Sequence, residues 1–173
     1  MKLVIQVVLL LVISSTTMSA QHPAGQCTNS KFEKKIDSYL SYTVNTITVK
    51  EAARHQENYT FLDAREPAEY AVSHIPEARL VGYDDFDLGV LEGLPKETPI
   101  VIYCSIGYRS EVIGEKLQKA GYTNVNNLYG SIFEWANQGH TLIDTDKNET
   151  NQVHTYNKRW SKWVINSTVE KVW

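Results

Sequence analysis

The stretch that decides the fold reads Pro99-Ile100-Val101-Ile102-Tyr103-Cys104-Ser105-Ile106-Gly107-Tyr108-Arg109-Ser110. Its first part is continuous, rich in β-branched side chains and preceded by proline, which is typical of a strand buried on both faces. A short loop follows Tyr103, and apolar spacing predicts a helix from about Arg109 to Ala120, with Gly121 as its stop. A buried strand that leads through a loop into a helix indicates an α/β sheet.

Cys104 stands where that loop begins. Ligands of α/β sheets bind beyond the carboxyl ends of the strands, and a loop before a helix can turn successive N–H groups toward an anion. Gly107 permits a backbone shape that a larger residue resists. Such a site lowers the pKa of a thiol from about 8.5 to roughly 3.5–7.5, so Cys104 is a candidate nucleophile. The alternative is a buried structural cysteine, which leaves the spacing of Gly107 and Arg109 unexplained.

The rest of the chain alternates strand and helix patterns. Further strands are expected at 59–63, 79–81 and 124–129, and further short helices at 131–137 and behind two capping boxes, Ser30 to Glu33 and Thr48 to Glu51. This alternation predicts an α/β fold in three layers, with a central, mostly parallel sheet flanked by helices.

Composition narrows the function classes. The chain has 173 residues with 17 Lys and Arg, 20 Asp and Glu, and a formal net charge of -3, which fits one domain with extensions. That balance argues against sequence-independent nucleic-acid binding, which needs clustered cations. Two cysteines without paired Cys/His spacing predict neither a disulfide scaffold nor a zinc site. We expect no metal and no cofactor.

The N-terminus resembles a secretory signal peptide. Lys2 precedes an apolar run, and small and polar residues follow as far as Ala20, the expected cleavage point. Residues 1–20 are therefore interpreted as a signal peptide, with an uncleaved anchor as the alternative. Cys27 suggests a lipoprotein, but Gln26 before it is a poor match to a lipid-attachment signal. We expect a periplasmic or secreted protein without stable membrane insertion after cleavage.

Three further segments follow the expected leader. Residues 21–46 are an N-terminal extension with a short amphipathic helix, 47–143 are the main domain, and 144–173 are a polar spacer and an aromatic tail. The tail is expected to dock on the domain; the alternative is a segment that binds a protein partner. Asn-x-Ser/Thr sequons, which carry glycans only in a eukaryotic secretory pathway, stand at Asn58, Asn148 and Asn166.

Several motifs together resemble the rhodanese (sulfurtransferase) family. The loop Cys104-x-x-Gly107-x-Arg109-Ser110 resembles the active-site loop of that family. The resemblance extends, in the right order, to Phe61-Leu62-Asp63-Ala64-Arg65-Glu66-Pro67-Ala68-Glu69-Tyr70, to Ser73-His74-Ile75-Pro76-Glu77-Ala78 and to Asn127-Leu128-Tyr129-Gly130-Ser131-Ile132-Phe133-Glu134-Trp135. It covers about residues 47–143. Ser73 and Glu77 depart from it, because the family often has glycine there.

The resemblance implies a mechanism. The Cys104 thiolate would take the outer sulfur of a small anionic donor such as thiosulfate, and the resulting persulfide would pass it to a thiol or to cyanide. Backbone N–H groups of the loop would hold the donor and the persulfide. The residues assigned to that substrate-binding loop are Ser105, Ile106, Gly107, Tyr108, Arg109 and Ser110.

Two other functions stay open at this point. Cysteine phosphatases and arsenate reductases also place Cys and Arg on a loop before a helix, but their loop has one residue more than the four that separate Cys104 from Arg109 here. A rhodanese-like module that only binds a partner is the second alternative, although such modules usually lack the cysteine.

Arg109 has two open roles: it binds the donor anion, or it turns inward to a carboxylate and holds the loop. Asp63 and Arg65 are interpreted as an ion pair that supports the loop. His74 is read as a hydrogen-bonding residue of a turn rather than a general base.

Three other side chains are assigned by their position in the sequence. Tyr108 is expected to line the mouth of the pocket, and Trp135 to lie in the core. Cys27 is interpreted as a free cysteine; the alternative is a resolving thiol that reaches Cys104.

Overall fold

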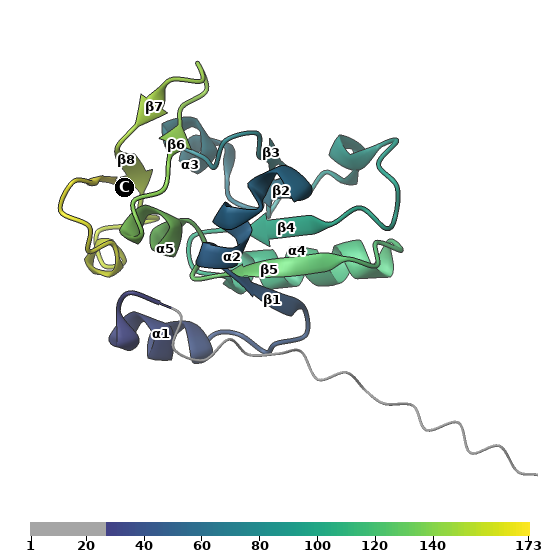
Figure 1. The fold of residues 1–173 in the computed structure, drawn as a ribbon, viewed down its shortest axis with the longest axis horizontal. Helices are drawn as coiled ribbons and strands as arrows, with labels where there is room; N and C mark the ends of the chain where they lie inside the picture. The colour runs from purple at the N-terminus through teal and green to yellow at the C-terminus, as the bar shows by residue number, and fades with distance from the viewer. Residues whose placement is uncertain (1–26) are drawn as a thin grey trace, which may run out of the picture.

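A five-stranded parallel sheet forms the centre of the molecule (Figure 1). The structure is a computed structural model and describes residues 27–173. The strand order is β1-β5-β4-β2-β3, with β1 at Asn45–Thr48, β5 at Val125–Tyr129, β4 at Ile100–Tyr103, β2 at Thr60–Asp63 and β3 at Arg79–Leu80. The predicted α/β fold with a parallel sheet is confirmed.

Strand β4 lies in the middle of the sheet, and all four of its residues are buried. Side chains alternate along a strand, and the two core clusters follow that alternation: Ile100 and Ile102 belong to one, Val101 and Tyr103 to the other. The expectation of a strand covered on both faces is confirmed. Packing against a core cluster on each face holds the carboxyl end of β4 in place.

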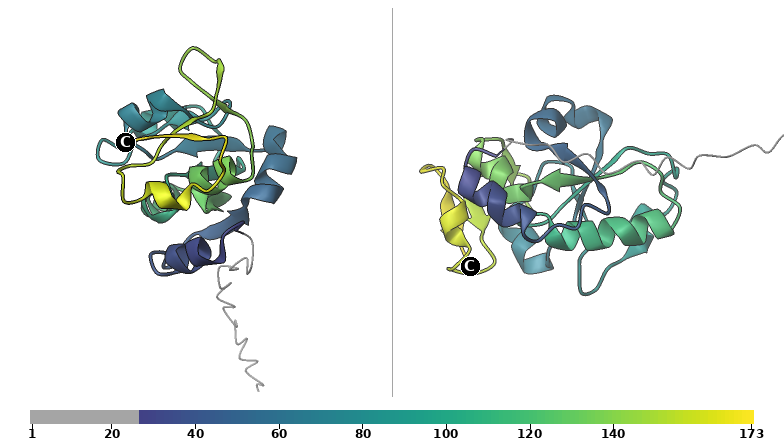
Figure 2. Two further views of the ribbon diagram at one scale, coloured as in Figure 1. Left: turned by 90° about the vertical axis from the view of Figure 1, so that its left-hand side faces the viewer. Right: turned by 90° about the horizontal axis from the view of Figure 1, so that it is seen from below.

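Helices cover both faces of the sheet (Figure 2). Helix α4, at Tyr108–Lys119, packs on the face that carries Ile100 and Ile102. The other face is covered by α1 at Ser30–Asp37, α2 at Val49–Arg54 and α5 at Ser131–Asn137. Helix α3 at Pro67–Val72 connects β2 to β3, and short 3-10 turns lie at Gln56–Asn58, Leu88–Leu91 and Ser161–Trp163.

The first residues of three helices test the predicted helix starts and caps. Thr48 caps α2 as predicted, because its side chain accepts a hydrogen bond from the backbone N–H of Glu51 at 3.1 Å. The capping box predicted at Ser30 was wrong. Asn29 is the N-cap of α1, and its carboxamide oxygen accepts hydrogen bonds from the N–H groups of Lys31 and Phe32. Helix α4 begins at Tyr108, one residue before its predicted start.

Strand β1 was not predicted. It is polar except for Ile47, so it lacks the apolar alternation that signals a strand. Its pairing with β5 along the edge of the sheet supplies the missing stability.

Residues 144–152, expected to be a polar spacer, contain one strand and the first residue of another. Glu149–Thr150 forms β7, which pairs with β6 at Leu142–Ile143, and Gln152–His154 forms β8. Asp144 shapes the turn between β6 and β7, because its carboxylate accepts hydrogen bonds from the N–H groups of residues 146 and 148. Such a side-chain-capped turn needs no apolar pattern.

The aromatic tail docks on the domain, as expected. Strand β8 pairs in parallel with β9 at Glu170–Val172, and Val153 and Val164 are fully buried in the core. The ring of Trp163 lies 5.6 Å from that of Phe32 in α1. The tail and the N-terminal extension therefore contact each other on the same side of the sheet.

The interpretation of residues 1–20 as a signal peptide lies outside the described residues. Within residues 27–173, no helix has the length and apolar character that crossing a membrane requires.

Candidate active site

Cys104 lies directly after the carboxyl end of β4 and is 1% exposed. Its backbone is held on two sides by the turn that begins α5: its N–H donates to Ser131 Oγ at 3.2 Å, and its carbonyl accepts from the N–H of Ile132 at 3.2 Å. Its Sγ accepts a hydrogen bond from the N–H of Gly107 at 3.2 Å. The loop thus curls around the sulfur, as the sequence predicted.

Gly107 closes this loop with φ +123, a conformation that side chains resist. A Cβ there would lie 3.3 Å from Leu40 Cδ2 and 3.6 Å from Asn127 Nδ2. Asn127 fixes the glycine carbonyl by donating to it at 2.9 Å. Ser110 Oγ lies 3.0 Å from the same carbonyl and 2.7 Å from Asn127 Oδ1. The loop shape is therefore set by buried side chains on α4 and β5.

The surroundings of Cys104 favour its thiolate. Burial opposes ionisation, but the positive charge of Arg109 and hydrogen bonds from Ser110 and Gly107 outweigh it, so the pKa of Cys104 lies below its ordinary value. A thiolate is the nucleophilic form of cysteine. The geometry therefore suits nucleophilic chemistry at the sulfur better than a purely structural role.

Arg109 turns inward to a carboxylate. Its Nη1 donates to Glu69 Oε2 at 2.6 Å, and its Nη2 donates to Glu69 Oε1 at 2.8 Å and to Ser105 Oγ at 2.9 Å. Such a two-pronged pair fixes both groups. Burial tends to raise the pKa of Glu69, but Arg109 and Arg65 lower it overall. Of the two roles left open for Arg109, the structure shows the inward one.

Asp63 and Arg65 form a fully buried pair at the end of β2. Arg65 Nε lies 2.9 Å from Asp63 Oδ1, and Arg65 Nη2 lies 2.6 Å from Asp63 Oδ2. The same Nη2 donates to the carbonyl of Ser73 at 2.6 Å. The guanidinium carbon lies 5.7 Å from the ring centroid of Tyr103. The pair thus holds the turn before β3 against the end of β4, and neither residue lines the pocket over Cys104.

His74 and Trp135 have structural surroundings. The ring of His74 stacks on that of Tyr70 at 3.8 Å, and its Nδ1 lies 3.1 Å from the Tyr70 carbonyl. Trp135 is 2% exposed, and its indole N–H donates to the carbonyl of Thr141 at 2.9 Å. These positions agree with the roles in a turn and in the core that the sequence indicated.

A pocket of about 290 Å³ opens over Cys104. Tyr108 lines it as expected, together with Ser105, Ile106 and Arg109 of the predicted loop. Gly107 and Ser110 do not line it and act on the sulfur from the protein side. The pocket lining also includes residues that the sequence analysis did not assign to the site, namely Tyr39, Tyr83, Tyr156 and Trp160.

Sequence reasoning also missed Glu69 and Asn127. Glu69 stands in α3, 40 positions from Arg109, and Asn127 lies within a strand, 20 positions from Gly107. A polar residue between buried residues of a strand is a signal for a specific hydrogen-bond partner, and this signal could have singled out Asn127. No local pattern identifies Glu69 as the partner of Arg109.

Cys27 forms no disulfide with Cys104. An ideal Cβ on Gly130 would approach its Sγ to 3.3 Å, so the thiol rests on the turn before α5. Burial and the nearby carboxylate of Glu134 raise its pKa well above the ordinary value. Both cysteines are free, and the surroundings of Cys27 keep its thiol protonated.

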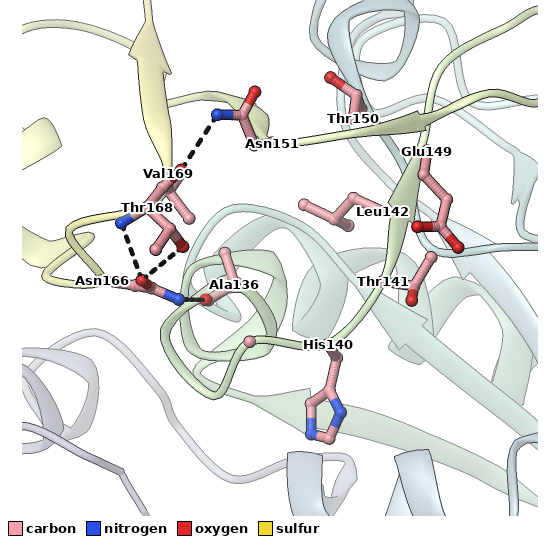
Figure 3. A pocket seen from close by; sticks show the side chains of 11 residues that line it. Ala136, His140, Thr141, Leu142, Glu149, Thr150, Asn151, Asn166, Thr168 and Val169 are labelled. Carbon is pink, nitrogen blue, oxygen red and sulfur yellow. Dashed lines mark hydrogen bonds between the residues drawn. The ribbon is translucent and has the colours of Figure 1, made fainter.

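A second hollow of about 460 Å³ lies between α5, β7 and the tail (Figure 3). It contains no cysteine and no cationic Lys or Arg among its lining residues. The sequon residue Asn166 lines it, with Nδ2 donating to the carbonyl of Ala136 at 2.9 Å. The sequon residues Asn58 and Asn148 are exposed. In the part of the chain from residue 27 onward, no cluster of three or more His, Cys, Asp or Glu side chains is arranged to hold a metal.

Comparisons with known proteins agree with this geometry. Residues 48–138 match the model of the rhodanese-like domain. A thiosulfate:glutathione sulfurtransferase of Saccharomyces cerevisiae is 31% identical over 132 residues, which are 69% of this chain and 92% of the relative. A sulfurtransferase of Allochromatium vinosum is 36% identical over 87 residues, 50% of this chain and 80% of the relative. The solution structure of a rhodanese-like domain from Anabaena has a TM-score of 0.55 at 21% identity, covers 61% of this chain and 83% of that chain, and supports the fold alone.

Proposed function

This chain belongs to the rhodanese-like domain family, and on that premise we propose that it is a thiosulfate sulfurtransferase that carries sulfur as a persulfide on Cys104. The family and its sulfurtransferase relatives support sulfur transfer as the chemistry. The single observation that carries the assignment to Cys104 is its position at the base of a pocket, with a lowered pKa and an N–H of the loop on its sulfur.

The proposed reaction has two steps. The Cys104 thiolate attacks the outer sulfur of thiosulfate, the sulfur–sulfur bond of the donor breaks, and sulfite leaves with the electron pair. A thiolate or cyanide then attacks the outer sulfur of the persulfide, and the electron pair returns to Cys104. The N–H of Gly107, which donates to Sγ, stabilises the negative charge of the Cys104 thiolate before the first step and again when the second step restores it.

The position of Arg109 bears on the phosphatase and arsenate reductase alternative. In cysteine phosphatase or arsenate reductase chemistry the oxyanion itself becomes bonded to the cysteine, and a free guanidinium must hold it there in two-pronged geometry, whereas in sulfur transfer only a single sulfur atom becomes bonded to the cysteine. Here both terminal nitrogens of Arg109 are engaged by Glu69 and Ser105. This supports sulfur transfer, together with the short loop of four residues between Cys104 and Arg109.

The test is the formation of thiocyanate from thiosulfate and cyanide. We expect turnover by the wild type, loss of turnover in Cys104→Ala, and retention in Cys27→Ala as the matched control. Turnover that survives in Cys104→Ala contradicts the mechanism. A folded wild type that transfers sulfur from neither thiosulfate nor polysulfide supports the alternative of a module that only binds a partner.

Export is a separate part of the proposal. It rests on the charged start, the apolar run and the small residues within 1–20. We expect the protein to be recovered from the periplasm or the medium with a new N-terminus near residue 21. Recovery of the uncleaved chain from the cytoplasm contradicts this part and leaves the chemistry at Cys104 untouched.

A further inference from the structure

The pocket over Cys104 has aromatic walls. Of its nine lining residues, Cys104 and Ser105, Ile106 and Arg109 form the base, and the other five are aromatic: Tyr39, Tyr83, Tyr108, Tyr156 and Trp160. We call these five side chains the aromatic rim. Tyr39 belongs to the N-terminal extension, and Tyr156 and Trp160 belong to the tail. These three lie outside residues 48–138, the part that matches the rhodanese-like domain.

Three residues of the aromatic rim, one each from the extension, the domain and the tail, are linked by ring contacts. The ring of Tyr39 lies edge-on to Tyr108 at 6.2 Å and to Trp160 at 5.6 Å. The tail is anchored next to it by Asn137 of α5, which donates to the carbonyl of Trp163 at 2.9 Å and accepts from the N–H of Ile165 at 2.7 Å. The rim is therefore a built wall of the pocket.

This wall leaves apolar surface open to solvent around a buried sulfur. Tyr39 is 38% exposed, Tyr108 45% and Tyr156 57%, whereas Cys104 is 1% exposed. Half of the large apolar side chains that residues 27–173 expose thus gather at one pocket. A cluster of exposed aromatic surface at a concave site marks a binding surface.

Charge at the pocket is balanced by the protein itself. Arg109 is the sole cation among the pocket-lining side chains, and Glu69 and Ser105 engage both of its terminal nitrogens. Outside the lining, Lys35 Nζ lies 4.5 Å from the ring centroid of Tyr39. The pocket lining therefore offers no unpaired cation that could bind a ligand with several carboxylates, whereas its aromatic faces can bind an apolar group.

From these observations we infer that the sulfur acceptor is a small thiol with an aromatic or other apolar group, bound by the aromatic rim. The inference rests on the proposed function. The pocket volume of about 290 Å³ admits a small molecule, and the burial of Cys104 requires the acceptor sulfur to reach the base. The acceptor thiol loses its proton to solvent, and its thiolate bonds to the outer sulfur of the persulfide. The persulfide bond breaks, and Cys104 leaves as the thiolate, so no oxidant or reductant is consumed.

The test compares benzyl mercaptan with glutathione as acceptors, with thiosulfate as donor. Burying a phenyl group is worth about tenfold or more in kcat/KM, so we expect benzyl mercaptan to exceed glutathione by at least about that factor. In the double variant Tyr156→Ala/Trp160→Ala, the ratio of the two rates should fall about tenfold. Trp173→Ala is the matched control, because Trp173 is an exposed tail aromatic outside the pocket, and it should leave the ratio unchanged.

A second measurement needs no variant. Benzyl methyl sulfide and S-methylglutathione have no free thiol and cannot accept sulfur. We expect the benzyl compound to inhibit the transfer of sulfur from thiosulfate to cyanide competitively, at a concentration at least about tenfold lower than S-methylglutathione requires.

Failure of the inference and failure of the proposed function give different results. If thiocyanate forms but glutathione equals or exceeds benzyl mercaptan, the inference is overturned and sulfur transfer stands. If the double variant keeps the wild-type ratio of the rates with benzyl mercaptan and glutathione, the inference is also overturned, because the aromatic rim then does not determine which acceptor is preferred. If no thiocyanate forms at all, the proposed function fails, and the inference fails with it.

Discussion

At the scale of single residues, Cys104 and Arg109 have different roles in the site. The Sγ of Cys104 accepts a hydrogen bond from the N–H of Gly107, whereas Arg109 donates its hydrogen bonds to Glu69 and Ser105. The guanidinium thus acts on the sulfur through its charge and through the shape of the loop. This division leads to two predictions.

The first prediction concerns the pKa of Cys104. Because that pKa lies below the ordinary value, alkylation by iodoacetamide should stay fast at a pH below about 8.5, where a free thiol slows down. Ser110→Ala removes a hydroxyl that stabilises the thiolate, so the midpoint of the rate against pH should move upward. Cys27 is the internal control, since burial raises its pKa and it should stay unmodified. A Cys104 that reacts no faster than Cys27 at neutral pH contradicts the electrostatic account.

The second prediction separates the two roles of Arg109. Arg109→Lys keeps the charge but loses the two-pronged geometry, so we expect a loss of about 1–3 kcal/mol in the free energy of unfolding. The change in KM for thiosulfate should be the smaller effect. Denaturant unfolding and steady-state kinetics measure both, with Arg79→Lys, at the exposed position of strand β3, as the control. A large rise in KM with unchanged stability would show that the guanidinium faces the donor.

At the scale of elements, the turn between α3 and β3 shows how the chain departs from its family. The sequence resemblance places Glu77 where the family often has glycine, and the structure keeps a left-handed backbone there with φ 63. The turn is anchored nearby by Arg65, which donates to the carbonyl of Ser73 at 2.6 Å. The anchored ends hold Glu77 in a conformation that a side chain disfavours.

A third prediction follows from that strain. Glu77→Gly should raise the free energy of unfolding by about 0.5–1 kcal/mol, because relief of the left-handed strain exceeds the added freedom of the unfolded chain. Glu77→Ala is the matched control: it removes the same charge but keeps a Cβ. Equal stabilisation by both substitutions would assign the effect to charge and contradict the backbone argument.

The elements that the sequence predicted share strong local signals. The run 99–103 and the helix after it have dense apolar spacing, and Thr48 is the predicted N-cap of α2, whose hydroxyl accepts a hydrogen bond from the N–H of Glu51. Strand β1 was missed because its stability comes from pairing with β5, which no local pattern reports. The aromatic rim was not predicted for the same reason. Tyr39 and Trp160 are far apart in sequence, and tertiary packing alone brings their ring centroids to 5.6 Å from each other.

At the scale of the whole molecule, the segments on either side of the rhodanese-like part complete it. Residues 48–138 supply four of the five strands of the sheet and the cysteine loop, and the flanking segments supply most of β1 and Tyr39, Tyr156 and Trp160 of the pocket wall. The tail also places His154 near the loop support, with its Nδ1 4.0 Å from Glu69 Oε1 and accepting from the N–H of Tyr156 at 3.2 Å. Protonation of His154 at low pH therefore affects both the support of the loop and the wall of the pocket.

The fourth prediction is a loss of stability in acid. Burial lowers the pKa values of His74, His140 and His154 below the ordinary value, so the unfolded chain binds more protons than the folded one just below about pH 6.5. This stability is fully present above that pH and is lost as the pH falls through the folded-state values. Glu69, whose pKa is also lowered, acts in the same direction further down.

Thermal unfolding across that pH range measures the effect. The melting temperature should fall as the pH is lowered from neutrality, and His154→Gln should make the fall less steep. A melting temperature that rises on acidification would mean that these histidines gain protons on folding, contrary to their burial.

The most direct test of persulfide chemistry on Cys104 is the intact mass of the reduced protein after incubation with thiosulfate and removal of the excess. The account predicts a gain of one sulfur atom on the wild type and on Cys27→Ala, none on Cys104→Ala, and reversal of the gain by cyanide. A gain that persists in Cys104→Ala, or no gain on the folded wild type with thiosulfate or polysulfide, would contradict it.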